Sequence, residues 1–141
     1  MPTRSASAEW KGGLKGQGSY SGRTGLGGQY NFSSRFEEGT TGSNPEELLA
    51  AADAACFSMA LAFALAKEGQ EAQSVQTTAD CSIEKQGEGW KITRIVLHSR
   101  VAGSGIDPTK FQAIAQATKE GCPVSSALKG NVQIELDAQL V

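Results

Sequence analysis

Apolar residues fill positions 48–66 almost without interruption, and this stretch predicts one long helix. Asn44 can cap its N-terminus, Pro45 suits its first position, and Gly69 suits its end. A helix that is apolar on nearly every face must be covered by protein or by lipid. Nine of the nineteen residues are alanine and Asp53 lies inside the stretch, which argues against a membrane span. We therefore expect a helix wrapped by protein, with alanines that let a second helix approach closely.

Alternating apolar and polar positions predict strands on both sides of this helix. Before it, residues 5–36 indicate two or three short strands joined by glycine turns, since ten of the 17 glycines precede residue 43. A floppy arm is the alternative there. After it, residues 75–83 and 90–102 are expected to pair as a hairpin, and residues 132–140 alternate as a last strand.

Two further helical segments follow the predicted hairpin. Asp107-Pro108 can begin a helix that ends at Gly121, and Cys122-Pro123 can begin a short helical turn that continues to Leu128. Hairpins mixed with single helices predict an α+β fold with antiparallel sheet, not a doubly wound parallel fold. The length of 141 residues favours one domain, residues 1–141.

The composition narrows the possible functions. The chain carries 13 basic and 15 acidic side chains, and this balance gives no footprint for nucleic acid or an anionic membrane. No charged segment followed by an apolar one opens the chain, so we expect a cytoplasmic protein. A single histidine, His98, makes zinc sites and Ser-His-Asp chemistry hard to build. No phosphate-binding glycine motif occurs, and we expect neither a metal nor a cofactor.

The three cysteines are the remaining candidates for chemistry, and their odd number points to a reducing compartment. Cys81 falls on the apolar face of a predicted strand, where it would pack as a small hydrophobic residue. Cys56 follows Asp53 by one helical turn, although a buried structural cysteine is the alternative. Cys122 precedes Pro123 at a helix N-terminus, which favours a thiolate, although it could equally close the helix start. Two thiols in different surroundings suggest a redox pair.

A buried attacking thiol needs a cation nearby, because burial raises its pKa. Arg35 is the first candidate, since it shortly precedes the long helix and can pair with Glu46 in that helix's first turn. Arg23 is the second candidate. A surface charge on a strand is the alternative role for Arg35.

Four segments together resemble the OsmC/Ohr family, and most closely its OsmC branch of osmotically inducible proteins related to organic hydroperoxide resistance proteins. They are FSSRFE at residues 32–37, NPEEL at 44–48, AACFSMA at 54–60 and GCPVS at 121–125. The resemblance implies a thiol peroxidase that acts under oxidative or osmotic stress. It also implies an intertwined homodimer, in which antiparallel sheets are wrapped around two long central helices.

The resemblance also implies roles for individual residues. Cys56 matches the peroxidatic cysteine and Cys122 the resolving cysteine, while Glu46 and Arg35 match the glutamate and arginine of the OsmC branch. The Ohr branch takes its arginine from nearer the N-terminus, so Arg23 stays open. Asp53 matches a variable position, and Cys81 matches no site of the family.

The expected reaction is reduction of an organic hydroperoxide through a Cys56 sulfenic acid and a Cys56–Cys122 disulfide, which an external dithiol then reduces. The alternatives are a non-catalytic stress-related ligand-binding dimer and a thiol redox sensor. Several apolar side chains are expected to line a pocket that prefers organic hydroperoxides, or else to be plain core: Phe36, Leu48, Leu49, Phe57 and Met59.

Overall fold

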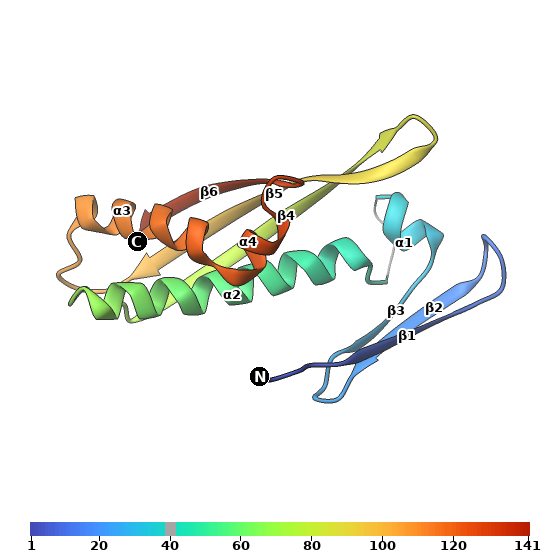
Figure 1. Ribbon diagram of the computed structural model, residues 1–141, viewed down its shortest axis with the longest axis horizontal. Helices are drawn as coiled ribbons and strands as arrows, with labels where there is room; N and C mark the ends of the chain where they lie inside the picture. Colours follow the sequence, from blue (N-terminus) through green and yellow to red (C-terminus); the bar gives the residue numbers. More distant parts are fainter. Residues whose placement is uncertain (39–41) are drawn as a thin grey trace. The chain divides into compact units, whose positions relative to one another are not determined.

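Residues 1–48 and 49–141 form two units in the computed structural model, which describes residues 1–38 and 42–141. Both units combine strands with helices, so the predicted α+β class is confirmed (Figure 1).

The first unit is built on a three-stranded antiparallel sheet in the order β1-β2-β3. Its strands are β1 (Ala6–Lys11), β2 (Gln17–Gly22) and β3 (Gly27–Tyr30). Gly12 and Gly25 have positive φ angles in the two connecting turns, a conformation that favours glycine. The prediction of short strands joined by glycine turns is confirmed, and the alternative prediction of a flexible, unstructured arm is wrong.

A short helix, α1 (Phe32–Phe36), follows β3, within residues 5–36 where only short strands and turns are expected from the sequence. Asn31 caps it by accepting a hydrogen bond from the Ser34 backbone N–H at 2.8 Å. The Ser34 hydroxyl accepts in return from the Asn31 N–H at 2.9 Å. This reciprocal cap satisfies free backbone donors and fixes the helical turn. Arg35 therefore lies on a helix and not on a strand.

The second unit contains a mixed three-stranded sheet in the order β4-β5-β6. β4 (Ser74–Gln86) and β5 (Gly89–Ala102) form the predicted antiparallel hairpin. β6 (Gln133–Leu140) runs parallel to β5, so the expectation of a wholly antiparallel sheet is wrong. The reason is the crossover between them, which contains α3 (Pro108–Gly121) and α4 (Pro123–Leu128) and returns the chain in the same direction.

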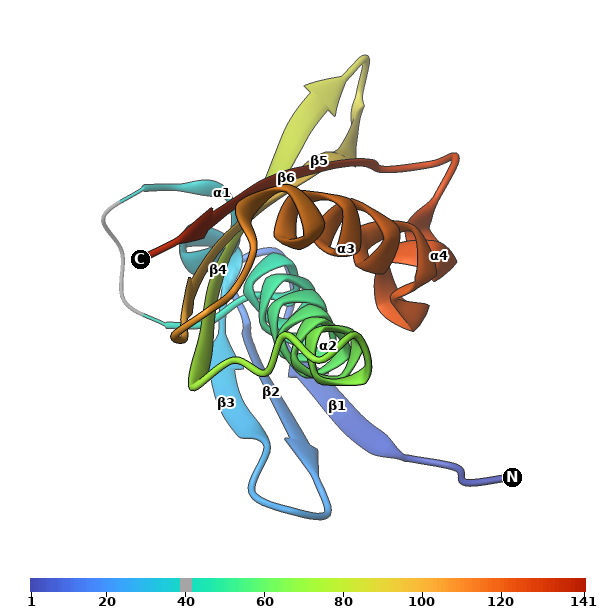
Figure 2. The ribbon, with the colours of Figure 1, turned by 90° about the vertical axis from the view of Figure 1, so that its left-hand side faces the viewer.

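Two helices cover one face of this sheet, α3 and the long helix α2 (Pro45–Lys67) (Figures 1 and 2). Alternate residues of β5 point into the core between the sheet and the helices, including the fully buried Ile95, Leu97 and Val101. From the helices, this core receives Phe57, Leu61, Leu65, Phe111 and Ala115. This packing fixes the position of α2 and α3 against the sheet.

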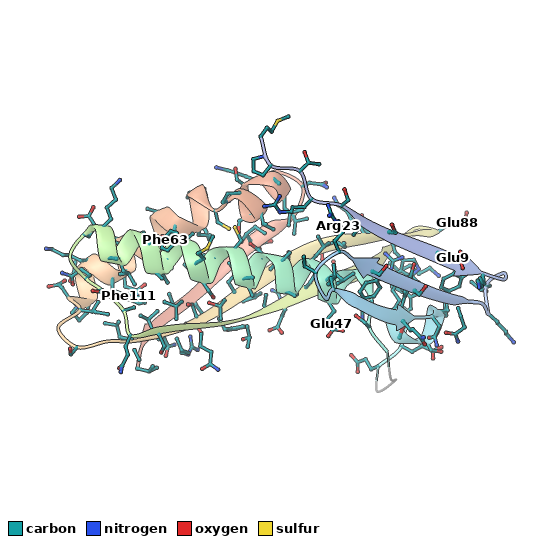
Figure 3. The ribbon with its side chains drawn as sticks, turned by 90° about the horizontal axis from the view of Figure 1, so that it is seen from below. Glu9, Arg23, Glu47, Phe63, Glu88 and Phe111 are labelled. Carbon is teal, nitrogen blue, oxygen red and sulfur yellow. The ribbon has the colours of Figure 1, made fainter. Side chains whose placement is uncertain are left out.

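Helix α2 begins and ends as predicted. The Asn44 side chain accepts a hydrogen bond from the Glu47 N–H at 2.7 Å, and Gly69 follows the helix with a φ of 72°. The helix is long and apolar enough to cross a membrane, but only 28% of its most apolar window is buried. Met59 is 59% exposed and Phe63 (labelled in Figure 3) is 68% exposed. A single chain covers one face of this helix, so its wrapping by protein on the other faces stays a prediction that depends on the expected homodimer.

Candidate active site

The structure brings the Cys56 and Cys122 sulfur atoms to within 3.0 Å of each other. Cys56 lies in the middle of α2 and is half-buried, whereas Cys122 lies between α3 and α4 and is fully buried. A disulfide bond needs about 2.05 Å between the sulfurs, so a small approach would join them. Of the three cysteines, these are the two that sequence reasoning assigned to a redox pair.

The packing of α3 explains why Cys122 reaches the interior. Phe111, Ala115 and Thr118 form the buried stripe of α3, and Cys122 follows at the same helical spacing. The Cys122 backbone N–H donates to the Thr118 carbonyl at 2.8 Å, after which Pro123 begins α4. The cysteine is therefore held between two helix ends with its side chain directed into the core.

Asp53 and Ser125 complete the group around the thiols. Asp53 is fully buried, and its Oδ1 accepts hydrogen bonds from the Ser125 hydroxyl at 2.6 Å and from the Cys122 thiol at 3.8 Å. Sequence reasoning did not select Ser125 and left Asp53 without a role. The sequence did carry one sign that these two residues lie near the thiols. Asp53 precedes Cys56 by one helical turn, and Ser125 follows Cys122 by one helical turn.

The surroundings of Cys56 raise its pKa. Burial is the largest cause, and the hydrogen bond with Cys122 adds to it. A backbone hydrogen bond from Val124 lowers the pKa, while the charges of Cys122 and Asp53 raise it further. Because peroxide attack requires the thiolate, these groups together disfavour the reactive form. The expectation that a nearby cation offsets them stays a prediction.

Arg35 and Glu46 form the ion pair that sequence reasoning expected. Arg35 Nη2 and Nε donate to Glu46 Oε1 at 2.9 and 3.1 Å, and Nε also lies 3.3 Å from Oε2. The Glu46 side chain is 7% exposed and lies in the first turn of α2, where the helix dipole favours a carboxylate. Arg23 lies exposed in the turn between β2 and β3 (Figure 3). Arg35 is therefore the arginine that Glu46 orients.

A cavity of about 400 Å³ lies beside Arg35 in the first unit. The residues that line it are Trp10, Gly13, Leu14, Tyr30, Asn31, Phe32, Arg35 and Phe36. Phe36 belongs to the expected apolar pocket, and its ring centre lies 5.1 Å from the Arg35 guanidinium. Phe57 does not belong to it, because it is fully buried in the core of the second unit. Sequence reasoning missed Trp10 and Tyr30, which strand pairing brings together.

The remaining candidates lie on the strands of the second unit. Cys81 on β4 packs against the core of the second unit, as expected for a small apolar residue. His98 on β5 contacts Asp80 at 3.1 Å and Asp137 at 3.5 Å. Within residues 1–38 and 42–141, no group of three or more His, Cys, Asp and Glu side chains is placed to hold a metal ion.

A family model described as OsmC-like protein matches residues 37–137, which include both thiols and the Arg35 partner Glu46. The chain belongs to the OsmC family. It is 49% identical over 136 residues to peroxiredoxin OsmC of Escherichia coli, covering 94% of this chain and 93% of that protein. It is also 34% identical to organic hydroperoxide resistance protein OhrB of Bacillus subtilis, over 72% of this chain and 73% of that one.

The fold of this OsmC-family chain agrees with solved structures. The crystal structure of Bacillus subtilis OhrB matches it with a TM-score of 0.74 and 30% sequence identity. The match covers 96% of this chain and 98% of that chain. The resemblance inferred from four short segments is thereby confirmed over nearly the whole sequence.

Proposed function

We propose that this chain is a thiol-dependent peroxidase that reduces organic hydroperoxides, with Cys56 as the attacking and Cys122 as the resolving cysteine. The observation that carries the proposal is the 3.0 Å contact between these two sulfur atoms. Relatives named peroxiredoxin OsmC and organic hydroperoxide resistance protein support the same reaction.

The reaction needs only thiol chemistry. The Cys56 thiolate attacks the O–O bond, one oxygen becomes the Cys56 sulfenic acid, and the other leaves as an alcohol. The Cys122 thiol then condenses with the sulfenic acid, so that a disulfide forms and water leaves. An external dithiol reduces the disulfide by exchange and restores both thiols.

Arg35 and its cavity would serve the first step. A guanidinium beside Cys56 would favour the thiolate and hold the peroxide oxygens, and Glu46 would hold the guanidinium in place. The aromatic side chains beside Arg35 offer an apolar surface for the carbon skeleton of an organic hydroperoxide. Hydrogen peroxide has no such part, so we expect it to be a poorer substrate.

Turnover and thiol counting together test the function. Reduced protein would receive a panel of organic hydroperoxides or hydrogen peroxide, with and without a dithiol. The peroxidase should lose two thiols per chain rapidly, recover them with the dithiol, and turn over many times. A ligand-binding protein would keep its thiols, and a redox sensor would lose them but turn over poorly; either result would contradict the proposal.

Replacing Cys122 with serine should allow one attack and then stop the cycle. Without a resolving thiol, the Cys56 sulfenic acid should persist and be driven to sulfinic and sulfonic acids by further hydroperoxide. Mass spectrometry of the reacted protein should therefore show added oxygen on Cys56. A variant that still turns over with a dithiol and gains no oxygen would show that Cys122 is dispensable.

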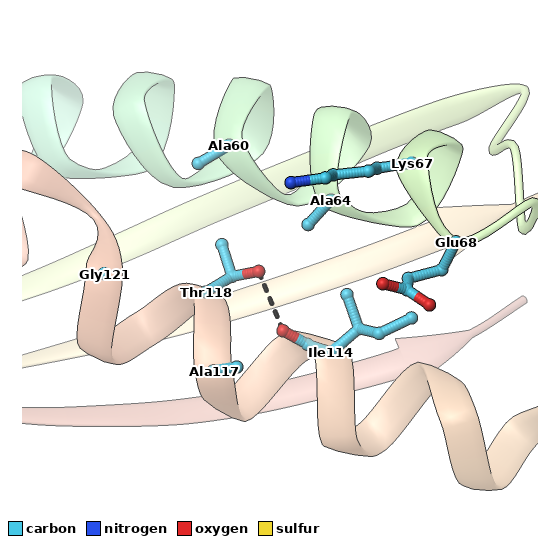
Figure 4. Close-up of a pocket in the computed structure, with 8 residues that line it drawn as sticks. All are labelled: Ala60, Ala64, Lys67, Glu68, Ile114, Ala117, Thr118 and Gly121. Carbon is cyan, nitrogen blue, oxygen red and sulfur yellow. Dashed lines mark hydrogen bonds between the residues drawn. The ribbon is translucent and has the colours of Figure 1, made fainter.

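We also propose that two chains form a homodimer through α2. Five apolar residues at helical spacing lie exposed on this helix: Ala52, Ala55, Met59, Phe63 and Ala66. Beside this stripe, a cavity of about 310 Å³ lies between α2 and α3 (Figure 4). It is lined by Ala60, Ala64, Lys67, Glu68, Ile114, Ala117, Thr118 and Gly121. A second copy of α2 is the occupant that matches this long apolar surface.

Sedimentation should show a dimer at micromolar concentration, because an obligate interface buries roughly 2,000 Å² or more. Phe63→Glu places a charge on the exposed stripe and should weaken the dimer, whereas Lys91→Glu on β5 serves as a charge-changing control. A wild-type monomer, or a Phe63→Glu variant that stays fully dimeric, would contradict this proposal.

Two further proposals concern the domain organisation of the chain and its location in the cell. We propose that the whole chain, residues 1–141, is a single OsmC-like domain, which is supported by the alignment over 94% of its length. We also propose a cytoplasmic location, where thiols stay reduced between turnovers. We expect no partnership with nucleic acid or membrane.

A further inference from the structure

Asp53 is a buried carboxylate that the reaction above does not use. It is fully buried, and its Oδ2 has no hydrogen-bond partner among the described residues. The titratable groups that face it are Cys56 on its own helix and Cys122 between α3 and α4. No arginine, lysine or histidine forms an ion pair with it within residues 1–38 and 42–141. A buried charge without a cation is costly and calls for an explanation.

The attack on peroxide does not supply that explanation. The negative charge of Asp53 raises the pKa of Cys56, and this reduces the thiolate available for the first step. An apolar or amide side chain at this position would favour the thiolate more. If Asp53 serves the reaction, it therefore does so later in the cycle.

The resolving step requires a group that accepts the proton of the Cys122 thiol, and Asp53 can be that group. Cys122 must lose its proton to become a nucleophile, but it is fully buried, so bulk water cannot readily accept that proton. Asp53 Oδ1 lies 3.8 Å from the Cys122 sulfur and accepts its hydrogen bond. The Ser125 hydroxyl, at 2.6 Å, holds the same oxygen in place.

We propose that Asp53 is the general base of the resolving step, an inference that rests on the proposed function. Its carboxylate takes the Cys122 thiol proton while the Cys122 sulfur attacks the sulfenic sulfur of Cys56. The new S–S bond forms as the S–O bond breaks, and the departing oxygen leaves as water after receiving that proton. The sulfenic sulfur is reduced, the Cys122 sulfur is oxidised, and Asp53 ends as a carboxylate again.

Asp53→Asn should change the two steps in opposite directions. In a single turnover with cumene hydroperoxide, the variant should form the sulfenic acid at least as fast as the wild type. Disulfide formation should slow by about 100-fold, within the range of general base catalysis. Dimedone should therefore trap much more sulfenic acid in the variant. Disulfide formation at the wild-type rate, or an equal slowing of both steps, would overturn the proposal.

Ser125→Ala is the matched control, since it removes a hydrogen bond to Asp53 but leaves the carboxylate beside Cys122. It should slow disulfide formation far less than Asp53→Asn does. If both variants slow disulfide formation equally, the effect belongs to the Asp53–Ser125 hydrogen bond, and the assignment of Asp53 as general base is overturned. A wild type that forms no sulfenic acid would refute the proposed function itself.

The pH dependence of disulfide formation in the wild type gives a second test, which does not depend on whether a variant folds. If Cys122 loses its proton to solvent, disulfide formation should rise about tenfold per pH unit below the ordinary thiol pKa. With Asp53 as the base, the wild-type rate should rise less steeply between about pH 6 and pH 8. A full tenfold rise per pH unit in the wild type would overturn the proposal.

Discussion

Replacing Cys56 with serine should abolish hydroperoxide consumption. A serine hydroxyl neither ionises near neutral pH nor forms the equivalent of a sulfenic acid, so neither step can proceed. We expect a loss of at least about 10⁴-fold, the scale seen when a catalytic nucleophile is removed. The measurement is hydroperoxide remaining over time with excess dithiol, together with the thiol count after a single equivalent of hydroperoxide.

Cys81→Ser is the control for this prediction, because it also removes one thiol from the second unit. Cys81 packs against the core and has no role in the proposed cycle, so turnover should stay close to that of the wild type. A modest loss of thermal stability is the expected effect of placing a hydroxyl there. A Cys81 variant as inactive as Cys56→Ser would mean that the redox pair is wrongly assigned.

Local sequence signals predicted most of the elements. Asn44, Pro45 and Gly69 marked the ends of α2, and Asp107 with Pro108 marked the start of α3. These residues act on the backbone within one helical turn, so the sequence alone shows their effect. The β4–β5 hairpin was equally readable, since Gly87 makes its turn with a positive φ angle of 63°.

The features that sequence reasoning missed depend on distant parts of the chain or on very short segments. The direction of β6 is set by a crossover of two helices, and strand alternation carries no information about direction. Helix α1 has five residues, which is too few to show a helical period. Asp53 meets Ser125 72 positions later, so only the folded chain shows that they share a hydrogen bond.

The pairing of Arg35 with Glu46 shows where sequence and structure agree on the site. Arginine can bind a carboxylate with two N–H groups, and a glutamate in the first turn of a helix is a suitable partner. The family resemblance pointed to the same two residues, and the structure joins them within the first unit.

We propose that the Arg35 guanidinium acts beside Cys56, and a neighbouring cation lowers the pKa of an acidic group by about one to three. Arg35→Ala should therefore slow peroxide attack by about 10- to 1,000-fold at pH 7. Burial already raises the pKa of Cys56, and removal of a cation that favours the thiolate should raise it further. The midpoint of Cys56 alkylation against pH should therefore move to higher pH. We would measure it in Cys81→Ser protein treated with a small alkylating agent.

Three variants separate the charge of Arg35 from its geometry and from the rival Arg23. Arg35→Lys should recover little activity, because an ammonium group cannot bind Glu46 through two N–H groups and face the sulfur at once. Glu46→Gln should do less harm than Arg35→Ala, since the positive charge remains but loses its fixed position. Arg23→Ala should leave the alkylation midpoint unchanged. If Arg23→Ala moves that midpoint and Arg35→Ala does not, the activating cation is Arg23, and the Arg35–Glu46 pair serves only the fold of the first unit.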